Sequence, residues 1–268
     1  MQDLATVILG LVEGLTEFLP ISSTGHLILT GRLLNFDAAV GQDFAQAFEV
    51  IIQLGAVLAI VAAYPGRMAG LLQFRERQGF SGLRGIGLLV ITTLPAGLLG
   101  LCTRKYIHAM LFTPTAVAFA LAAGATWILL IERYHPQART HSIDSLSWRL
   151  ALGVGLFQCL ALWPGMSRSA ATIVGGMMLG VDRKAAVEYS FFAAVPIMVA
   201  ATIYELYKSL PILDSRYLGL AALGLVVSFL SAWLAVRLFV RFVGNHTLTP
   251  FGWYRLAVAV VVFGVILA

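Results

Sequence analysis

Two short stretches of the sequence concentrate residue types that can carry out acid–base and phosphate chemistry. The first reads E-G-L-T-E-F-L-P-I-S-S-T-G-H and covers residues 13–26. Its two carboxylates, Glu13 and Glu17, are four residues apart and therefore share one face of a helix. Two buried carboxylates so close together either share a proton or hold a cation. The alternative is that they cap the helix or pair with a structural arginine.

Hydroxyl groups and a histidine follow the proline of this stretch. Ser22, Ser23 and Thr24 come directly after Pro20-Ile21 and precede another apolar run. Serine and threonine at this place cap the next helix, and a helix N-terminus also binds anions. His26 is the only histidine inside an apolar segment, and imidazole suits proton transfer near neutral pH. These features predict a catalytic role for His26.

The second stretch, P-G-M-S-R-S-A-A-T, covers residues 164–172 and places a single arginine among hydroxyl groups. Arg168 lies between Ser167 and Ser169, with Thr172 one turn further on. Arginine keeps its charge, so inside a membrane it needs an anion. Its planar fork suits phosphate oxygens, and this predicts a phosphate-binding segment. The alternative partner is a glutamate of the first stretch.

A third candidate carboxylate lies in the sequence Q-A-F-E-V-I-I-Q. Gln46, Glu49 and Gln53 form a polar stripe at helical spacing on an otherwise apolar segment. Glu49 either lines the entrance to a site or orients another of its groups, and a role in packing or pairing is the alternative.

The composition places these residues in a membrane protein. The chain has 268 residues, of which 59% are hydrophobic and 12% charged, whereas soluble domains average about 45–50% and about 25%. The net charge of +5 lies mainly between the apolar runs, which argues against a nucleic-acid partner. Six runs are long enough to cross a bilayer as helices. They cover about residues 44–64, 85–103, 113–132, 187–207, 217–240 and 251–268.

Two further apolar segments, 4–34 and 147–180, are each broken near the middle by a polar stretch that contains proline. Non-helical backbone at membrane depth needs cover from protein or a water-filled cavity, so each segment is predicted to be a re-entrant helix-break-helix. Setting Pro20 over Pro164 also places Ser23 over Ser167. The order of elements then repeats between about 1–135 and about 140–268.

One broken segment and three spans in each half make an inverted repeat, which brings the two breaks face to face near the midplane. The predicted fold is therefore a single all-α polytopic membrane domain, residues 1–268, with six transmembrane helices and two re-entrant segments. Twelve Lys and Arg residues fall in the loops 65–84, 133–149, 181–186 and 237–255, and five fall on the other side. The positive-inside rule makes the richer side cytoplasmic and directs both termini outward.

With these residues in place, the sequence resembles the undecaprenyl pyrophosphate phosphatase family, which is associated with bacitracin resistance. The two polar stretches, the F-E-V-I-I-Q-L-G segment and the chain length carry the resemblance. One departure is Ala170, where the family is expected to have glycine. The resemblance implies a bacterial inner-membrane hydrolase that converts undecaprenyl diphosphate to undecaprenyl phosphate and inorganic phosphate. It would recycle the lipid carrier of peptidoglycan synthesis, with a divalent metal, Mg²⁺ or Ca²⁺, and a site open to the periplasm.

Carried over to this sequence, the resemblance implies active-site roles for Glu13, Glu17, Ser23, His26, Ser167, Arg168 and Thr172. The two glutamates are expected to bind the metal. Arg168, with Ser22, Ser167, Ser169 and Thr172, is expected to hold phosphate oxygens, and Glu49 and Gln53 to support the site.

Ser23 is the favoured nucleophile with His26 as base, and attack by His26 or by activated water stays open. A transporter or flippase for a polyprenyl phosphate lipid is the alternative function. The sequence leaves open whether the chain forms a homodimer.

Overall fold

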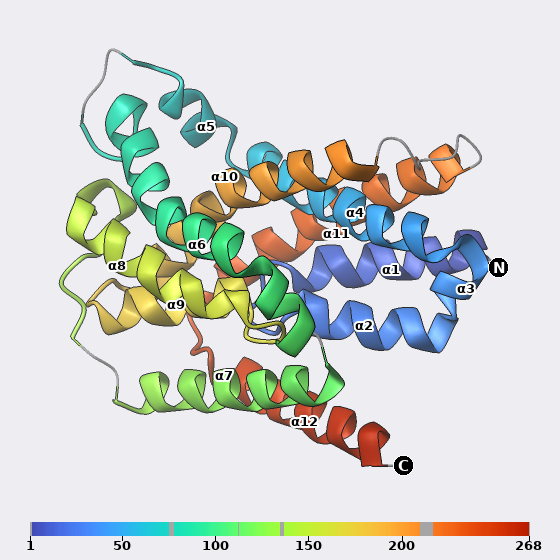
Figure 1. The fold of residues 1–268 in the computed structure, drawn as a ribbon. Helices are drawn as coiled ribbons and strands as arrows, with labels where there is room; N and C mark the ends of the chain where they lie inside the picture. Colours follow the sequence, from blue (N-terminus) through green and yellow to red (C-terminus); the bar gives the residue numbers. More distant parts are fainter. Residues whose placement is uncertain (1, 75–77, 112, 135–136, 210–216, 268) are drawn as a thin grey trace.

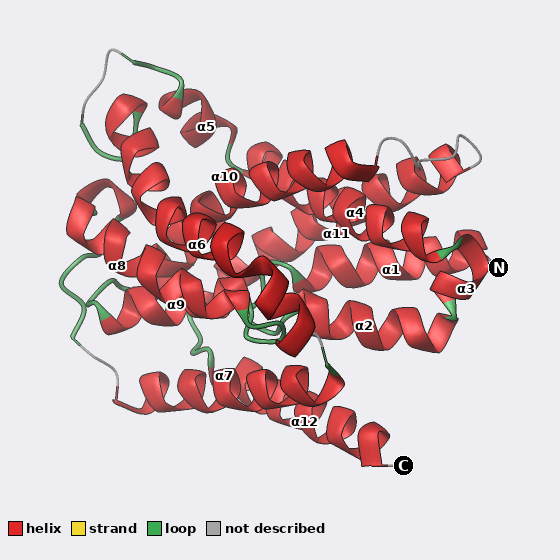
Figure 2. Cartoon of the chain, in the orientation of Figure 1, coloured by secondary structure: helices red, strands yellow, loops and turns green. Residues whose placement is uncertain are grey.

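The computed structural model describes residues 2–74, 78–111, 113–134, 137–209 and 217–267, and these ranges are almost entirely helical (Figure 1). The helices are α1 (Gln2–Thr16), α2 (Ser23–Leu34), α3 (Phe36–Val40), α4 (Gln42–Ala63), α5 (Pro65–Leu71), α6 (Gly82–Leu111), α7 (Pro114–Tyr134), α8 (Trp148–Gln158), α9 (Arg168–Met178), α10 (Arg183–Ser209), α11 (Leu218–Val243) and α12 (Thr249–Leu267), with short 3₁₀ turns at Ile143–Ser145 and Cys159–Leu162. Figure 2 shows no strand in this part of the chain.

Five helices are long and apolar enough to cross a membrane, namely α4, α6, α7, α10 and α11. The chain is therefore a multi-pass membrane protein, as its composition predicts. The sixth predicted run forms α12, whose apolar stretch Thr249–Gly264 falls short of the length of the other five. The count of six spans stays a prediction.

Both predicted helix breaks occur. α1 and α2 pack side by side on one side of the molecule, while α8 and α9 lie on the opposite side (Figure 1). The loops between the helices of each pair meet in the middle, where Figure 2 draws them in green. There the Ser169 hydroxyl donates a hydrogen bond of 2.7 Å to the carbonyl oxygen of Leu19. Proline in each break removes a backbone donor, which ends the first helix of the pair.

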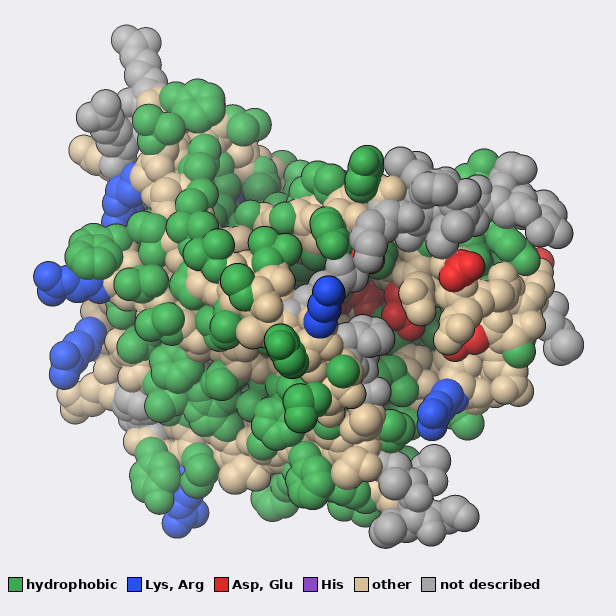
Figure 3. Space-filling model, in the orientation of Figure 1, with side chains coloured by type: hydrophobic (Ala, Val, Ile, Leu, Met, Phe, Trp, Pro, Cys, Tyr) green, Lys and Arg blue, Asp and Glu red, His purple; other side chains and the backbone are tan. Residues whose placement is uncertain are grey.

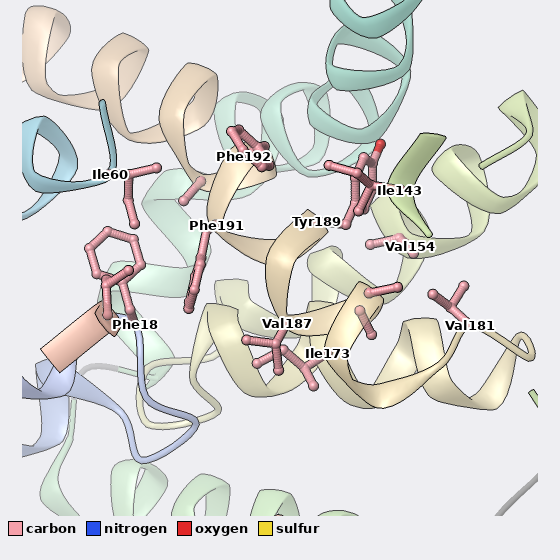
Figure 4. Close-up of a cluster of buried hydrophobic side chains, with 14 of the residues drawn as sticks. Phe18, Ile60, Ile143, Val154, Ile173, Val181, Val187, Tyr189, Phe191 and Phe192 are labelled. Carbon is pink, nitrogen blue, oxygen red and sulfur yellow. The ribbon is translucent and has the colours of Figure 1, made fainter. Parts of the chain in front are cut away.

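An aromatic core supports this meeting point from one side. Phe18, in the first break, is fully buried and packs edge-to-face on Phe191 of α10, with ring centroids 5.5 Å apart. Figure 4 shows Phe18 at one end of a layer that continues through Phe192 and Tyr189. Burying such rings is strongly stabilising, so the break is held by packing and not only by its own hydrogen bonds.

Several positive charges lie along one edge of the molecule. Figure 3 shows Lys and Arg side chains along the edge where α8 begins and α9 ends. Three of the residues in the charge count, Arg75, Arg77 and Arg216, lie outside the described residues. The sequence places Arg255 at the end of the predicted loop 237–255, and this prediction is wrong: Arg255 lies in α12 and is 0% exposed. Removing it from the count leaves the charge bias in the same direction.

A polar cluster outside the spans joins α5 to the segment before α8. Asp144 accepts from Arg67 at 2.8 and 3.0 Å, from the Phe80 backbone N–H at 2.8 Å and from the Ser142 hydroxyl at 3.2 Å. The hydrogen bonds from Arg67 are the main reason why the pKa of Asp144 lies below its ordinary value of 3.8.

Replacing Asp144 by asparagine is expected to lower the melting temperature at pH 7 by roughly 2–4 °C, because a half-exposed ion pair is worth up to about 1 kcal/mol. A carboxyl whose pKa is lower in the folded state stabilises the fold above its ordinary pKa. This contribution is lost as the pH falls from 3.8 through the folded-state pKa. Melting curves of both proteins in detergent should therefore differ at pH 7, and the difference should shrink as the pH falls below 3.8. Equal melting temperatures at pH 7 would contradict the prediction.

Candidate active site

In the first break, a serine hydroxyl donates a hydrogen bond to a glutamate. Ser22 caps α2 by accepting from the Gly25 N–H at 3.4 Å, and it adopts a φ of 74°. A non-glycine residue at such a φ is strained by about 1–3 kcal/mol, and such residues cluster at functional sites. The next hydroxyl, that of Ser23, donates to Glu17 Oε2 at 2.5 Å. Glu17 can therefore accept a proton from Ser23 directly.

The second break repeats the same cap. Ser167 has a φ of 73° and accepts from the Ala170 N–H at 3.2 Å. Gly165 before it has a φ of 95°, and a Cβ there would lie 2.6 Å from the Val117 carbonyl oxygen. Only glycine fits this turn. The cap geometry pairs Ser22 with Ser167, one residue away from the register that the proline alignment predicts.

Arg168 connects the two breaks. It donates to Glu17 Oε1 at 2.9 Å and to the Ser190 carbonyl oxygen at 3.1 Å, and its guanidinium lies 5.4 Å from the centre of the Phe18 ring. The side chains of Arg168 and Glu17 are 12% and 7% exposed, so this ion pair is largely shielded from water. The Nε of Arg168 is buried without a partner. The arginine therefore has the glutamate partner of the alternative prediction, and its side chain also lines a cavity.

A cavity of about 220 Å³ lies against Ser23, Glu17 and Arg168. Both breaks, α4 and α10 contribute to its wall. The residues with polar side chains that line it are Glu17, Ser22, Ser23, Thr24, Gln53, Gln158, Trp163, Ser167 and Arg168. Of the residues predicted to hold phosphate, Ser22, Ser167 and Arg168 thus reach the cavity.

Two predicted phosphate ligands lie behind the cavity wall instead. Ser169 is fully buried, and its hydroxyl is engaged with Leu19 and with the Ser167 hydroxyl. The Thr172 hydroxyl bonds to the Ser190 hydroxyl at 2.7 Å and to the Arg168 carbonyl oxygen at 2.9 Å. Both hydroxyls tie α9 to its neighbours, so they position Arg168.

His26 faces away from Ser23. Its Nδ1 lies 2.7 Å from the Ser22 carbonyl oxygen and its Nε2 lies 2.7 Å from the Tyr254 hydroxyl, on α12. The two rings are parallel, with centroids 5.6 Å apart. His26 is also absent from the residues that line the cavity. The predicted contact between Ser23 and His26 is not formed in this structure. Glu17, and not His26, accepts the hydrogen bond from the Ser23 hydroxyl.

The remaining carboxylates belong to a second cavity. Glu13 is 1% exposed and its Oε1 has no hydrogen-bond partner. Together with Glu49 and Gln53, Glu13 lines a cavity of about 350 Å³. The second cavity shares Ser23, Thr24 and Gln53 with the first. Figure 3 shows acidic side chains inside and beside a hollow on this face.

Arg255 is a further residue of the site, and it lies outside both predicted polar stretches. It donates to the carbonyl oxygens of Pro20 at 3.2 Å and Met166 at 3.0 Å, one in each break, and to Gly165 at 3.0 Å. Two further bonds go to Ala120 and Leu121 of α7. All five donors of the guanidinium are thus used. The sequence signal is an arginine one turn inside the apolar run that begins at residue 251, a place where a loop charge is not needed.

Known proteins match this chain over almost its whole length. A family model described as "Bacitracin resistance protein BacA" matches residues 6–261. A protein of Nitratidesulfovibrio vulgaris named undecaprenyl-diphosphatase is 58% identical over 264 residues, which cover 98% of each chain. Proteins with the same name from Oleidesulfovibrio alaskensis (98% of each chain) and Solidesulfovibrio magneticus (98% of this chain, 97% of the relative) are 55% and 53% identical. The chain belongs to the bacitracin resistance protein BacA family.

Proposed function

We propose that this protein hydrolyses undecaprenyl diphosphate to undecaprenyl phosphate and inorganic phosphate, and so recycles the lipid carrier for peptidoglycan synthesis. The observation that carries the proposal is the hydrogen-bonded series Ser23–Glu17–Arg168, which spans both breaks at a cavity wall. It occurs in a chain that is 53–58% identical to proteins named undecaprenyl-diphosphatase. A polyprenyl tail also explains why such a site lies within a membrane protein, because the lipid stays in the bilayer and only its head must reach the cavity.

The geometry supports Ser23 as the nucleophile. Its Oγ attacks the terminal phosphorus, its proton passes to Glu17 Oε2, and the bridging P–O bond breaks to release undecaprenyl phosphate. Water then hydrolyses the phosphoserine and inorganic phosphate leaves. Arg168 supplies the counter-charge for Glu17 and lines the cavity in which the phosphate oxygens would lie.

The supporting roles follow from the positions of the other residues. Ser22 and Ser167 line the cavity at the starts of α2 and α9, where backbone N–H groups favour an anion. Ser169 and Thr172 position Arg168 from behind. His26, held by Tyr254, orients the first turn of α2, and attack by His26 would require its ring to leave this contact.

Glu13 fits a divalent cation. A buried carboxylate oxygen without a partner is costly, and a cation removes that cost. Mg²⁺ or Ca²⁺, when bound, neutralises part of the charge on the phosphate oxygens. Glu13 would hold it.

The topology proposed for this function has six transmembrane helices, two re-entrant segments and an inverted repeat within one domain. The bias of Lys and Arg toward the side where α8 begins supports a cytoplasmic location for that side (Figure 3). The site then faces the periplasm from the bacterial inner membrane. A transporter of polyprenyl phosphate lipids is not favoured, since the relatives carry the name of a phosphatase.

The test is phosphate release from undecaprenyl diphosphate by the protein purified in detergent. We expect release that EDTA abolishes and Mg²⁺ or Ca²⁺ restores. Glu17→Gln should lower kcat by about 10² to 10⁴-fold, because it removes the acceptor of the Ser23 proton. Ser228→Ala, which removes a buried hydroxyl bonded to the Ile52 carbonyl oxygen, is the control and should keep wild-type kcat.

No phosphate release by the wild type, or full activity of Glu17→Gln, would contradict the proposed function. In that case uptake of a labelled prenyl phosphate by proteoliposomes would be the next measurement.

A further inference from the structure

Glu17 is poorly placed to bind a metal. Its two oxygens already accept hydrogen bonds, Oε1 from Arg168 and Oε2 from Ser23. The guanidinium donor is 2.9 Å away. Two like unit charges at 4 Å repel each other by about 4 kcal/mol at an effective dielectric constant of about 20. A divalent cation on Glu17 would therefore face a strong opposing charge.

Glu13 lies one helical turn earlier, and its environment is the opposite. The residue is 1% exposed and its Oε1 has no hydrogen-bond partner, so nothing balances this oxygen in the described part of the chain. It lines the second cavity, which is separated from Arg168: the arginine lines only the first cavity. The second cavity is thus the place where a cation is most needed.

The second cavity also supplies the other ligands. Glu49 projects into it from α4, with Gln53 one turn further along the same helix, and the Ser23 hydroxyl reaches it from α2. Carboxylate, amide and hydroxyl oxygens are the hard ligands that Mg²⁺ and Ca²⁺ prefer. Among the described residues no three carboxylate, imidazole or thiol groups form a complete metal site. Glu13 and Glu49, which line the second cavity together with a third carboxylate, Glu205, would leave positions for phosphate oxygens, as is usual for Mg²⁺ in proteins.

We propose that Glu13 and Glu49, with the side-chain oxygen of Gln53, hold the divalent cation, and that Glu17 is not a metal ligand. The inference rests on the proposed function, since it assigns the cation of the same site. It divides the carboxylates into two tasks: Glu17 with Arg168 serves the first cavity, and Glu13 with Glu49 serves the second. Ser23, Thr24 and Gln53 line both cavities, so the cation lies beside the attacking hydroxyl.

The test measures binding of the metal alone to the substrate-free protein. Mn²⁺ binding to the detergent-purified full chain is followed by electron paramagnetic resonance, with Mg²⁺ as competitor. Glu49→Gln and Glu13→Gln should each raise the Kd for Mn²⁺ by at least about tenfold. Glu17→Gln should leave the Kd within about threefold of wild type, since it removes no ligand.

The matched control is Glu188→Gln, which changes a carboxylate of α10 that lies 3.8 Å from Arg67 and outside both cavities. Melting curves without metal show whether each variant is folded, and Glu49→Asp should recover part of the affinity that Glu49→Gln loses. A larger loss in Glu17→Gln than in Glu49→Gln, or no Mn²⁺ binding by the wild type, would overturn the inference. Phosphate release does not enter this measurement, so a failure of the proposed function is recognised separately.

Discussion

Replacing Arg168 by lysine is expected to lower kcat/KM for undecaprenyl diphosphate by at least about a hundredfold. The guanidinium donates to Glu17 Oε1 at 2.9 Å and to the Ser190 carbonyl oxygen at 3.1 Å. A lysine ammonium is a point charge on a flexible stem, so it cannot hold both partners in the fixed geometry of the guanidinium. Arg168→Ala should lose more, about 10³ to 10⁵-fold. Phosphate release at several substrate concentrations measures both variants.

The matched control for Arg168→Lys is Arg183→Lys. Arg183 also forms a shielded ion pair, with Glu132, in which the two side chains are 17% and 2% exposed. It lies outside both cavities, so its replacement should lower the melting temperature and leave kcat/KM unchanged. Equal losses of activity in the two variants would mean that Arg168 acts through folding alone.

Replacing Arg255 by methionine is expected to lower the melting temperature by roughly 10 °C and kcat by at least about a hundredfold. The change leaves five carbonyl oxygens without their donor, in both breaks and in α7. Removing one partner of a buried charged network costs about 3–5 kcal/mol. A shift of about 1 Å between reacting groups is enough for a hundredfold loss of rate. Melting curves and phosphate release measure the two effects.

A second variant disturbs Arg255 without removing its charge. A Cβ on Gly124 would lie 2.8 Å from the Arg255 Cζ, so Gly124→Ala should displace the guanidinium. We expect kcat to fall while KM changes little, because the cavity residues are all present but misaligned. Gly97→Ala, where a Cβ meets nothing within 4 Å, is the control. Arg255→Lys should lower the melting temperature less than Arg255→Met does, because a lysine ammonium still offers three donors in place of the five of arginine. Wild-type kcat in Gly124→Ala together with a displaced guanidinium would contradict the positioning role.

Much of this site could be predicted from local sequence. Proline and small polar residues inside an apolar run leave few alternatives to a break that protein must cover, and both breaks occur where they were expected. A carboxylate four residues from another and an arginine among serines are equally local signals. The meeting of Glu17 with Arg168 then follows once the two breaks are placed face to face.

The partners of single side chains could not be predicted in this way, because they depend on packing between distant segments. His26 is three residues from Ser23, which suggests a shared face, yet its ring bonds to Tyr254, 228 positions away. Arg255 lies one turn inside an apolar run, but its contacts depend on the packing of α12 against α7. The strained cap at Ser22 also shifts the pairing of the two repeats by one residue relative to the prolines.

Rapid-quench trapping tests whether the Ser23 hydroxyl, hydrogen-bonded to Glu17, makes the first bond to phosphorus. Undecaprenyl diphosphate labelled with ³²P in its terminal phosphate is mixed with the purified protein and quenched within milliseconds. We expect a phosphoenzyme that is stable to acid and labile to base, maps to Ser23 by mass spectrometry and is absent from Ser23→Ala. A phosphoenzyme that is labile to acid and stable to base would place the phosphate on His26. The absence of any phosphoenzyme during turnover would favour direct attack by water, and either result would show that Ser23 is not the nucleophile.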